Sequence, residues 1–479
     1  MQLKYLFTGF LLLSLPSCSE EFLDLAPISS ANANTFYKTS SDMVLAINGA
    51  YDALQLPGQY GAYFVVSEIP SDDTAPPLSG SITNQDEFDK FYLRTTNPLL
   101  AERWGDAYIG IYRSNAVIDR IPTVEMDEAL KDRIIGEAKF LRALMYFNLV
   151  RVFGDVPLVL KEITDTNEGY TYGRTPVSQV YDQIIMDLLD AESLLPQIYT
   201  GRNVGRATSG AAKALLGKVY LTLNKYSDAA AKLNEVVDLE NAGVYGLLLN
   251  YADVFQPANK NGKETVFSVQ YKKGNLGEGS GFANLYAPQV SGNAVILFSG
   301  DGNNRPTADI ENAYEEGDIR KNVSMANSYL NEQGVVVDFY YVKKFADTPV
   351  VKYDSEDNWP VIRFADVLLM YAEALNETGK TQEALALLNR IRDRAQLPDK
   401  GLLTQQETRV ALEQERRVEL AFEGHRWFDL VRTGRALEVL NSKAQALSIA
   451  TVLTEKNLIF PVPQSQIDVN PQLIKQNPL

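Results

Sequence analysis

Residues 359–395 have the sequence WPVIRFADVLLMYAEALNETGKTQEALALLNRIRDRA, and this stretch decides the fold. Apolar and small residues recur at helical spacing on both sides of Gly379: Leu368, Ala372, Leu375, Ala384, Leu388 and Ile391. Because glycine interrupts helices, we expect two antiparallel helices joined by a tight turn. The small side chains of Ala372 and Ala384 let the helices approach closely, as in a tetratricopeptide helix pair.

A second segment, residues 413–436, has the sequence EQERRVELAFEGHRWFDLVRTGRA. Its first part predicts a helix of alternating charge, and its second part is rich in aromatic residues. Four of its charged residues are expected to form ion pairs around that helix: Arg416, Arg417, Glu419 and Glu423. His425, the single histidine, is expected to make an interior structural hydrogen bond rather than to shuttle protons.

Three motifs in these segments resemble the C-terminal signature of the SusD/RagB family of nutrient-binding outer-membrane lipoproteins. They are RFADVLLMYAEALNE (363–377), LNRIRDRA (388–395) and ERRVELAFEGHRWFDLVR (415–432). The final segment NLIFPVPQSQIDVNPQLIKQNP (457–478) is similar to the family's terminal motif, although Gln466 replaces an acidic residue. The resemblance implies a binding protein that is not an enzyme, with a glycan ligand and a SusC-like TonB-dependent transporter as partner. In RagB-like members the ligand is a peptide.

Further helix pairs precede these segments. The clearest one covers residues 205–237, where seven residues match tetratricopeptide spacing: Leu216, Gly217, Tyr220, Tyr226, Ala229, Leu233 and Val236. Weaker pairs are predicted at about 42–121 and 130–195. The predicted fold is therefore mainly α, with about four helix pairs stacked into one superhelix.

Two regions lack this helical pattern. Residues 59–98 form a long irregular stretch, and residues 238–360 form a loop-rich insertion with strand-like runs at 265–271 and 335–343. We expect the insertion to lie on the helices without a core of its own. The predicted organisation is an N-terminal region over 22–237 and a C-terminal region over 262–479.

The N-terminus has the features of a lipoprotein leader. A short apolar run over 5–15 precedes Leu-Pro-Ser-Cys, which resembles a lipobox ending at Cys18, and two glutamates follow. These features predict a signal peptide over 1–17, lipidation of Cys18, and an outer-membrane protein anchored by lipid at the cell surface. The alternative is an ordinary secreted protein in which this cysteine has no role.

Composition excludes several classes of function. The formal net charge is −16, which disfavours nucleic acid as a partner because phosphate binding needs clustered Lys and Arg. One cysteine and one histidine cannot build a disulfide framework, a Cys/His zinc site or a Cys–His nucleophile pair. The glycine-rich stretch 277–281 is interpreted as a flexible loop, because it neither follows a clear strand nor precedes a helix. The stretch 301–304 is interpreted as a turn, because Arg305 and Asn312 stand where a calcium loop needs oxygen ligands. Asp86, Glu87 and Asp89 could bind a cation between them, but a solvated loop is favoured. No metal, cofactor or enzymatic activity is expected.

The ligand is expected where residues 59–98 meet residues 270–345. Sugars bind to exposed aromatic rings and to polar groups that accept or donate hydrogen bonds, and both regions are rich in these residues. The candidates are Tyr60, Tyr63, Asp72, Asp73, Phe88, Tyr92, Phe282, Tyr286, Tyr340 and Tyr341. Two alternatives stay open: a peptide-binding protein of the same architecture, and a tetratricopeptide scaffold that only assembles other proteins.

Overall fold

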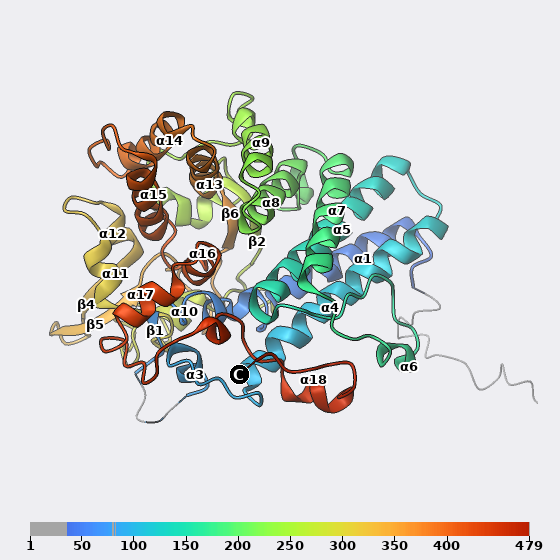
Figure 1. Cartoon of the computed structure of the whole chain (residues 1–479), viewed down its shortest axis with the longest axis horizontal. Helices are drawn as coiled ribbons and strands as arrows, with labels where there is room; N and C mark the ends of the chain where they lie inside the picture. The colour runs from blue at the N-terminus through green and yellow to red at the C-terminus, as the bar shows by residue number, and fades with distance from the viewer. Residues whose placement is uncertain (1–35, 79–80, 82, 479) are drawn as a thin grey trace, which may run out of the picture.

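The computed structural model describes residues 36–78, 81 and 83–478 (Figure 1). The predicted signal peptide and Cys18 lie outside these residues. Helices make up most of the fold, and the described strands form three separate two-stranded sheets. Within the described part of the chain, no helix has both the length and the apolar character needed to cross a membrane.

The four predicted helix pairs are confirmed, with these bounds: α1 (Ser40–Asp52) with α4 (Pro98–Arg120), α5 (Glu128–Phe153) with α7 (Val177–Leu194), α8 (Ser209–Thr222) with α9 (Tyr226–Val237), and α13 (Phe364–Glu377) with α14 (Thr381–Arg394). Successive pairs stack through α4 on α5, α7 on α8 and α9 on α13. The last contact spans the insertion, so the fourth pair continues the superhelix from which it is separated in sequence.

Local sequence explains how these helices begin and pack. Thr39 and Asp42 form a capping box at the start of α1, and Asn97 caps α4 just before Pro98. In the third pair, a Cβ at Gly217 would lie only 2.5 Å from Cγ of Leu233. Glycine at this position therefore lets α8 and α9 approach as closely as the predicted repeat requires.

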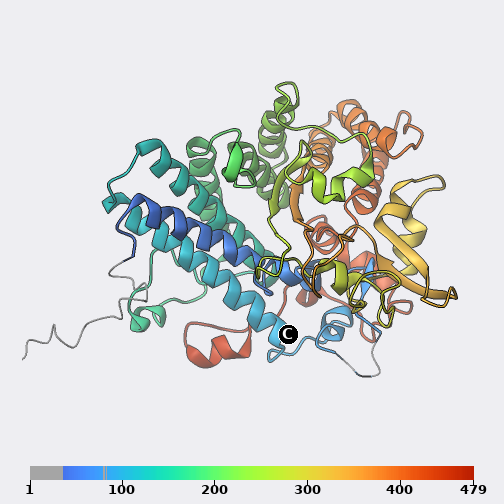
Figure 2. The ribbon, with the colours of Figure 1, turned by 180° about the vertical axis from the view of Figure 1, so that it is seen from behind.

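The insertion contains short strands that join distant parts of the chain. β2 (Thr265–Val269) pairs with β6 (Trp359–Arg363), β4 (Met325–Leu330) pairs with β5 (Val336–Val342), and β1 (Thr74–Ala75) pairs with β3 (Arg305–Pro306). The two predicted strand-like runs are thus observed, whereas β4 and β6 were not predicted. The β4–β5 hairpin lies at one end of the molecule and the first two helix pairs at the other (Figure 2).

The other α-helices complete the structure, and all of them except α15 are short. They are α2 (Phe64–Ser67), α3 (Asp86–Asp89), α6 (Thr166–Gly169), α10 (Phe282–Tyr286), α11 (Ala308–Ala313), α12 (Arg320–Ser324), α15 (Gln405–Glu419), α16 (Arg426–Arg432), α17 (Ala436–Ser442) and α18 (Gln464–Val469). One large apolar core includes side chains from the helix pairs, from residues 59–98 and from the insertion. The boundaries of the N- and C-terminal regions stay a prediction.

Helix α16 lies against the inner face of the superhelix. The guanidinium carbon of Arg151, on α5, lies 4.1 Å from the ring centroid of Phe428. At the start of α16, Nδ1 of His425 lies 3.1 Å from Nζ of Lys218 on α8. At its end, Nη2 of Arg432 donates to Glu373 on α13 over 2.8 Å. These three partners belong to the first helices of three successive pairs, and a cavity lined by residues of α5, α8, α13 and α16 remains between them.

A buried network of ion pairs joins α15 to the insertion, as predicted for its charged residues. Arg363, at the end of β6, donates to Glu264 over 2.9 Å, to Glu419 over 2.6 Å and to Glu423 over 2.7 Å. Burial alone would raise the pKa of Glu419, but the guanidinium groups of Arg394 and Arg363 hold it well below its usual range. The prediction of ion pairs is confirmed, and their burial makes them part of the core.

Candidate ligand-binding site

The two irregular regions meet, as the sequence predicts. Strand β1 from the first region pairs with β3 from the insertion. Beside this pairing, Nε2 of Gln85 donates to Oδ1 of Asn303 over 2.8 Å, and the Thr307 hydroxyl donates to the carbonyl of Asp72 over 2.7 Å. A ligand at this junction stays a prediction.

Several of the predicted aromatic contacts are buried. The hydroxyl of Tyr63 accepts a 2.7 Å hydrogen bond from Arg151, and its ring lies among core aromatics. Phe88 packs on Phe460 with 5.4 Å between ring centroids, and Tyr286 packs on Phe64 at 5.5 Å. The helices α2, α3 and α10 turn these rings inward, and Tyr60 and Phe282 are buried with them. In this conformation a fully buried ring has no face to offer a sugar.

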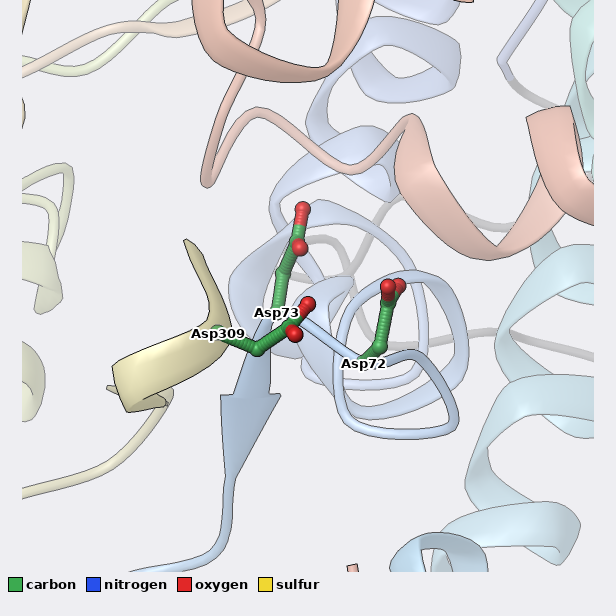
Figure 3. A group of neighbouring side chains, drawn as sticks. All are labelled: Asp72, Asp73 and Asp309. Atoms are coloured by element: carbon green, nitrogen blue, oxygen red, sulfur yellow. The ribbon is translucent and has the colours of Figure 1, made fainter. Parts of the chain in front are cut away.

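The predicted carboxylates Asp72 and Asp73 are also buried, and they hold the chain together (Figure 3). Oδ1 of Asp72 accepts from Arg426 over 2.8 Å, and Oδ1 of Asp73 accepts from Arg417 over 2.7 Å. Burial would raise the pKa of Asp72, but Arg426 and Arg417 hold it well below its usual range.

Asp309, on α11, brings a third carboxylate to this group, with spacing that would suit a cation. Arg417 donates to Asp309, and Nζ of Lys443 lies 2.6 Å from both Asp72 and Asp309. The protein's own guanidinium and ammonium groups therefore already neutralise these carboxylates. We interpret the cluster as an attachment of residues 59–98 to the C-terminal helices.

Three predicted residues keep access to solvent. Tyr92 is exposed after α3. Tyr340 and Tyr341 are adjacent on β5 and so point to opposite faces of the hairpin. The Tyr340 hydroxyl donates to Glu311 over 2.6 Å, and Tyr341 is half-buried opposite Ala326. Since Tyr340 and Tyr341 face apart, they do not form one aromatic surface.

Two other aromatic rings, Phe298 and Tyr353, are each 45% exposed, and their backbone segments are linked through one residue. Both are held by the buried amide of Asn284 on α10. Nδ2 of Asn284 donates to the carbonyls of Leu297 and Ser299, each over 2.8 Å, and Oδ1 accepts from the Tyr353 backbone over 2.9 Å. We call residues 297–301 and 352–353 the Asn284 platform.

The backbone of this platform is strained. Phe298, Ser299 and Tyr353 have φ angles of 68°, 63° and 67°, in the left-handed region that favours glycine. Nearby Val290, which is 92% exposed, has φ of 59°, although a β-branched residue is disfavoured there. Such conformations cost free energy, persist only where the surroundings impose them, and cluster at functional sites. The strain supports the platform as the candidate site.

Polar groups lie beside the Tyr353 ring. Asp301 accepts from Nζ of Lys352 and from the hydroxyl of Tyr353, each over 2.8 Å. The backbone N–H of Asp301 donates to the carbonyl of Asn284 over 2.9 Å. An aromatic surface with a carboxylate and an ammonium group beside it can bind a sugar through its C–H face and its hydroxyls.

Sequence reasoning missed both rings. Phe298 lies in the glycine- and serine-rich part of the insertion, and Tyr353 lies beyond the predicted limit at 345. An aromatic residue between small residues, as in Leu-Phe-Ser-Gly at 297–300, was an available signal, because small neighbours leave a ring exposed. For Tyr353 the sequence carries no comparable signal.

Other predictions about chemistry can be compared with the structure. His425 is buried beside Lys218, and burial together with that ammonium group lowers the pKa of His425 to about 3. An interior histidine, held neutral, is thus confirmed. The stretch 86–89 was expected to be a solvated loop, which is wrong. It forms α3, and its buried Glu87 accepts from Nε of Arg94 over 2.8 Å.

Two family models match the chain. The model described as SusD family covers residues 293–479, and the model described as starch-binding associating with outer membrane covers residues 21–221. Among curated relatives, SusD-like protein P2 of Formosa agariphila is 28% identical over 98% of each chain. A SusD-like protein of Bacteroides ovatus is 26% identical over 91% of this chain and 83% of that protein.

Solved structures that resemble this chain are also SusD-like proteins. A laminarin-binding SusD-like protein is 31% identical, with a TM-score of 0.80 over 92% of this chain and all of that chain. A SusD homologue from Bacteroides thetaiotaomicron is 26% identical, with a TM-score of 0.80 over 92% of this chain and 97% of the other. Their helix-pair architecture matches the four stacked pairs described above.

Proposed function

This chain belongs to the SusD family, and on that premise we propose that it binds an oligosaccharide at the Asn284 platform and delivers it to a TonB-dependent transporter in the outer membrane. The observation that carries the proposal is that two exposed aromatic residues, Phe298 and Tyr353, lie on backbone segments that one buried amide holds. Rings that are already held in place lose little conformational entropy when a ligand binds, so modest contacts suffice.

The first ligands to test are laminari-oligosaccharides. The relative that shares 31% of its residues with this chain is named as laminarin-binding. Two exposed rings beside a carboxylate and an ammonium group suit a sugar chain, whose flat C–H faces alternate with hydroxyls. Affinity is expected to be roughly micromolar or poorer, since the platform offers little rigid apolar area. Chelators should leave binding unchanged.

The position of α16 argues against a protein that only assembles other proteins. A superhelix of helix pairs offers partners its extended concave surface. Here α16 and the residue before it contact α5, α8 and α13, so a partner would find this side of the helix pairs partly occupied. A peptide ligand is the remaining alternative, and it is an outcome of the experiment below.

Calorimetry tests the proposal with a panel of laminari-oligosaccharides, other neutral oligosaccharides and peptides. Phe298→Ala and Tyr353→Ala should each weaken glycan binding by about 1 kcal/mol, the size of an aromatic contact, without changing the unfolding midpoint. Tyr170→Ala is the matched control, because Tyr170 is also an exposed aromatic residue and lies on the distant α6 segment.

Three results would decide against this site or ligand. Binding of a glycan with the same affinity by all three variants would place the site elsewhere. An equal loss in the Tyr170 variant would show that the effect is not local. Binding of peptides alone would replace the glycan by a peptide ligand.

Anchoring and delivery are further parts of the proposal. Lipidation of Cys18 would attach the mature chain to the outer membrane, probed by Cys18→Ala. That variant should appear in the soluble fraction or keep its leader, as seen by mass, whereas a membrane-bound variant of normal mass would contradict lipidation. We expect the helix pairs, which form the extended surface, to dock on the transporter. Crosslinks to a transporter confined to residues 260–345 would contradict that.

A further inference from the structure

The ammonium group of Lys352 lies at the Asn284 platform, and the carboxylate of Asp301 neutralises its charge. Nζ of Lys352 lies 2.8 Å from Oδ1 of Asp301 and 4.8 Å from the ring centroid of Tyr353. The hydrogen bond with Asp301 raises the pKa of Lys352, so the ammonium form persists at neutral pH. Both side chains keep partial solvent access, at 37% for Lys352 and 26% for Asp301.

We propose that Asp301 determines which glycans this site accepts: it holds the ammonium group of Lys352, so that the platform selects uncharged oligosaccharides and rejects those carrying carboxylates or sulfates. The inference rests on the proposed function and names the substrate class of the same site. Removing the carboxylate should free the ammonium group for an anionic ligand. Asp301 is therefore a specificity-determining residue.

The geometry fixes the carboxylate in this position. The backbone N–H of Asp301 is bonded to the carbonyl of Asn284, and its second carboxylate oxygen accepts from the Tyr353 hydroxyl over 2.8 Å. The residue after Lys352 is bonded through its backbone to the side chain of the same asparagine. Asn284 thus positions both partners, and Lys352 must leave Asp301 and the Tyr353 ring in order to reach a ligand anion.

The residues around the platform carry a net negative charge, which also disfavours anionic ligands. Residues 270–358 contain thirteen Asp and Glu but eight Lys and Arg. Three other lysines of this region are bound to carboxylates: Lys272 to Glu356 at 2.9 Å, Lys273 to Asp347 at 2.9 Å and Lys321 to Glu311 at 3.1 Å. A polyanionic glycan therefore approaches a surface of the same sign, which disfavours its association.

A purely structural role for the pair is the alternative. Partly exposed ion pairs contribute little to folding free energy, so stability alone gives no strong reason for this contact. The two roles differ in a measurable way. A structural pair alters stability when it is broken, whereas a selectivity determinant alters the ranking of ligands.

The experiment uses the full mature chain and two probes with one backbone: laminarihexaose, and laminarihexaose whose primary hydroxyls are oxidised to carboxylates. The variants are Asp301→Asn, Asp301→Asn with Lys352→Gln, and Glu332→Gln. The last is a charge control, because Glu332 lies in the same region and accepts from the Asn293 backbone, a bond that glutamine can keep.

We expect the parent to bind the neutral probe more tightly than the oxidised one. Asp301→Asn should bind the oxidised probe about fivefold more tightly than the parent, the size of a partly exposed charge contact, and the gain should fall with added salt. The double variant should lose that gain, and Glu332→Gln should not show it.

The outcomes separate this inference from the proposed function. If Asp301→Asn shows no gain for the oxidised probe, or if the parent binds both probes equally, the inference is wrong. Failure of the parent to bind laminarihexaose counts against the proposed ligand, while a gain by Asp301→Asn in the same experiment would still support the role of Asp301. A gain that persists in the double variant would exclude Lys352 as its cause.

Discussion

Two buried carboxylates, Glu419 at the end of α15 and Asp357 in the insertion, have opposite pKa shifts. Glu419 is surrounded by Arg320, Arg363 and Arg394, and its pKa is well below the usual range. Asp357 accepts from the Ser355 hydroxyl over 2.9 Å and from the backbone of Asp347 over 3.2 Å. Burial raises the pKa of Asp357 to about 7.

The difference shows how the two regions are stabilised. Around α15, cations compensate the charges that the fold buries, so the network resists change once it has formed. Around Asp357, a hydroxyl and a backbone N–H compensate the buried carboxyl group, and the nearby segment that carries Tyr353 is held in the same way. The Asp354 carboxylate, one residue after Tyr353, accepts from the N–H groups of Gly274 and Asn275. The network around α15 supplies stability, and the segment that carries Tyr353 supplies an adjustable surface.

The largest expected effect is in the ion-pair network that joins α15 to the insertion. Arg363→Ala would leave Glu264, Glu419 and Glu423 with fewer cationic partners in a buried site. Removing one partner of a buried ion pair costs about 3–5 kcal/mol of folding free energy. Urea unfolding would measure it, with Arg409→Ala as the control, since exposed Arg409 pairs with Glu377 at 2.7 Å. Similar losses in both variants would contradict the comparison.

A smaller effect is expected where the platform is held. Asn284→Ala would remove three hydrogen bonds and leave the carbonyls of Leu297 and Ser299 and the N–H of Tyr353 without this partner. We expect a loss of about 2 kcal/mol of folding free energy. Glycan affinity should fall more than in either ring variant, because both rings lose their support.

Calorimetry with the glycan and urea unfolding would be compared for Asn284→Ala and Asn303→Ala. Asn303 is the control because its side chain contacts Gln85 at the junction rather than the platform. Unchanged glycan affinity in the Asn284 variant would show that this residue does not position the rings.

An effect of similar size is expected from pH. The native state keeps the proton of Asp357 up to about pH 7, whereas the unfolded chain releases it near the ordinary pKa of 3.8. The native state therefore binds more protons between these values, and stability falls as pH rises. Between pH 5 and 8 this contribution should be about 2 kcal/mol.

Asp357→Asn mimics the protonated carboxyl group and should remove this part of the pH dependence. Urea unfolding of parent and variant at pH 5, 6, 7 and 8 would measure the difference. Parallel profiles would show that Asp357 titrates in the native state as it does in the unfolded chain.

Sequence predicted the helix pairs because their pattern is periodic and local. Ala372 and Ala384, like Gly217, mark close contacts that only small residues allow, and the structure confirms those pairs. Strand β6 was missed because Trp359–Arg363 leads directly into α13 and contains Pro360, which disfavours a strand. Strand β4 was missed because Asn327 and Ser328 interrupt its apolar pattern.

The candidate site was less predictable for a physical reason. In irregular segments, sequence has no period that separates inward from outward side chains. Tyr63 and Phe88 look like exposed loop aromatics, yet short helices turn both rings into the core. Asn284 holds residues that are more than fifty positions apart, and such a contact depends on the final path of the chain. Composition indicated residues 270–345 as a source of exposed aromatic rings. The fold adds Phe298 within this range and Tyr353 beyond it.

The position of α16 has a consequence for how the chain acquires its structure. The surface that α16 covers is formed by α5, α8 and α13, which all precede it in sequence. Until residues 426–432 are in place, Arg151 on α5 lacks the Phe428 ring that lies 4.1 Å from its guanidinium carbon. Contacts between distant segments form slowly, and an incompletely packed chain is prone to self-association in the meantime. The helix pairs therefore reach their final packing only after residues 426–432 have been synthesised. A premature stop before Arg426 should yield an aggregation-prone protein rather than a shorter functional one.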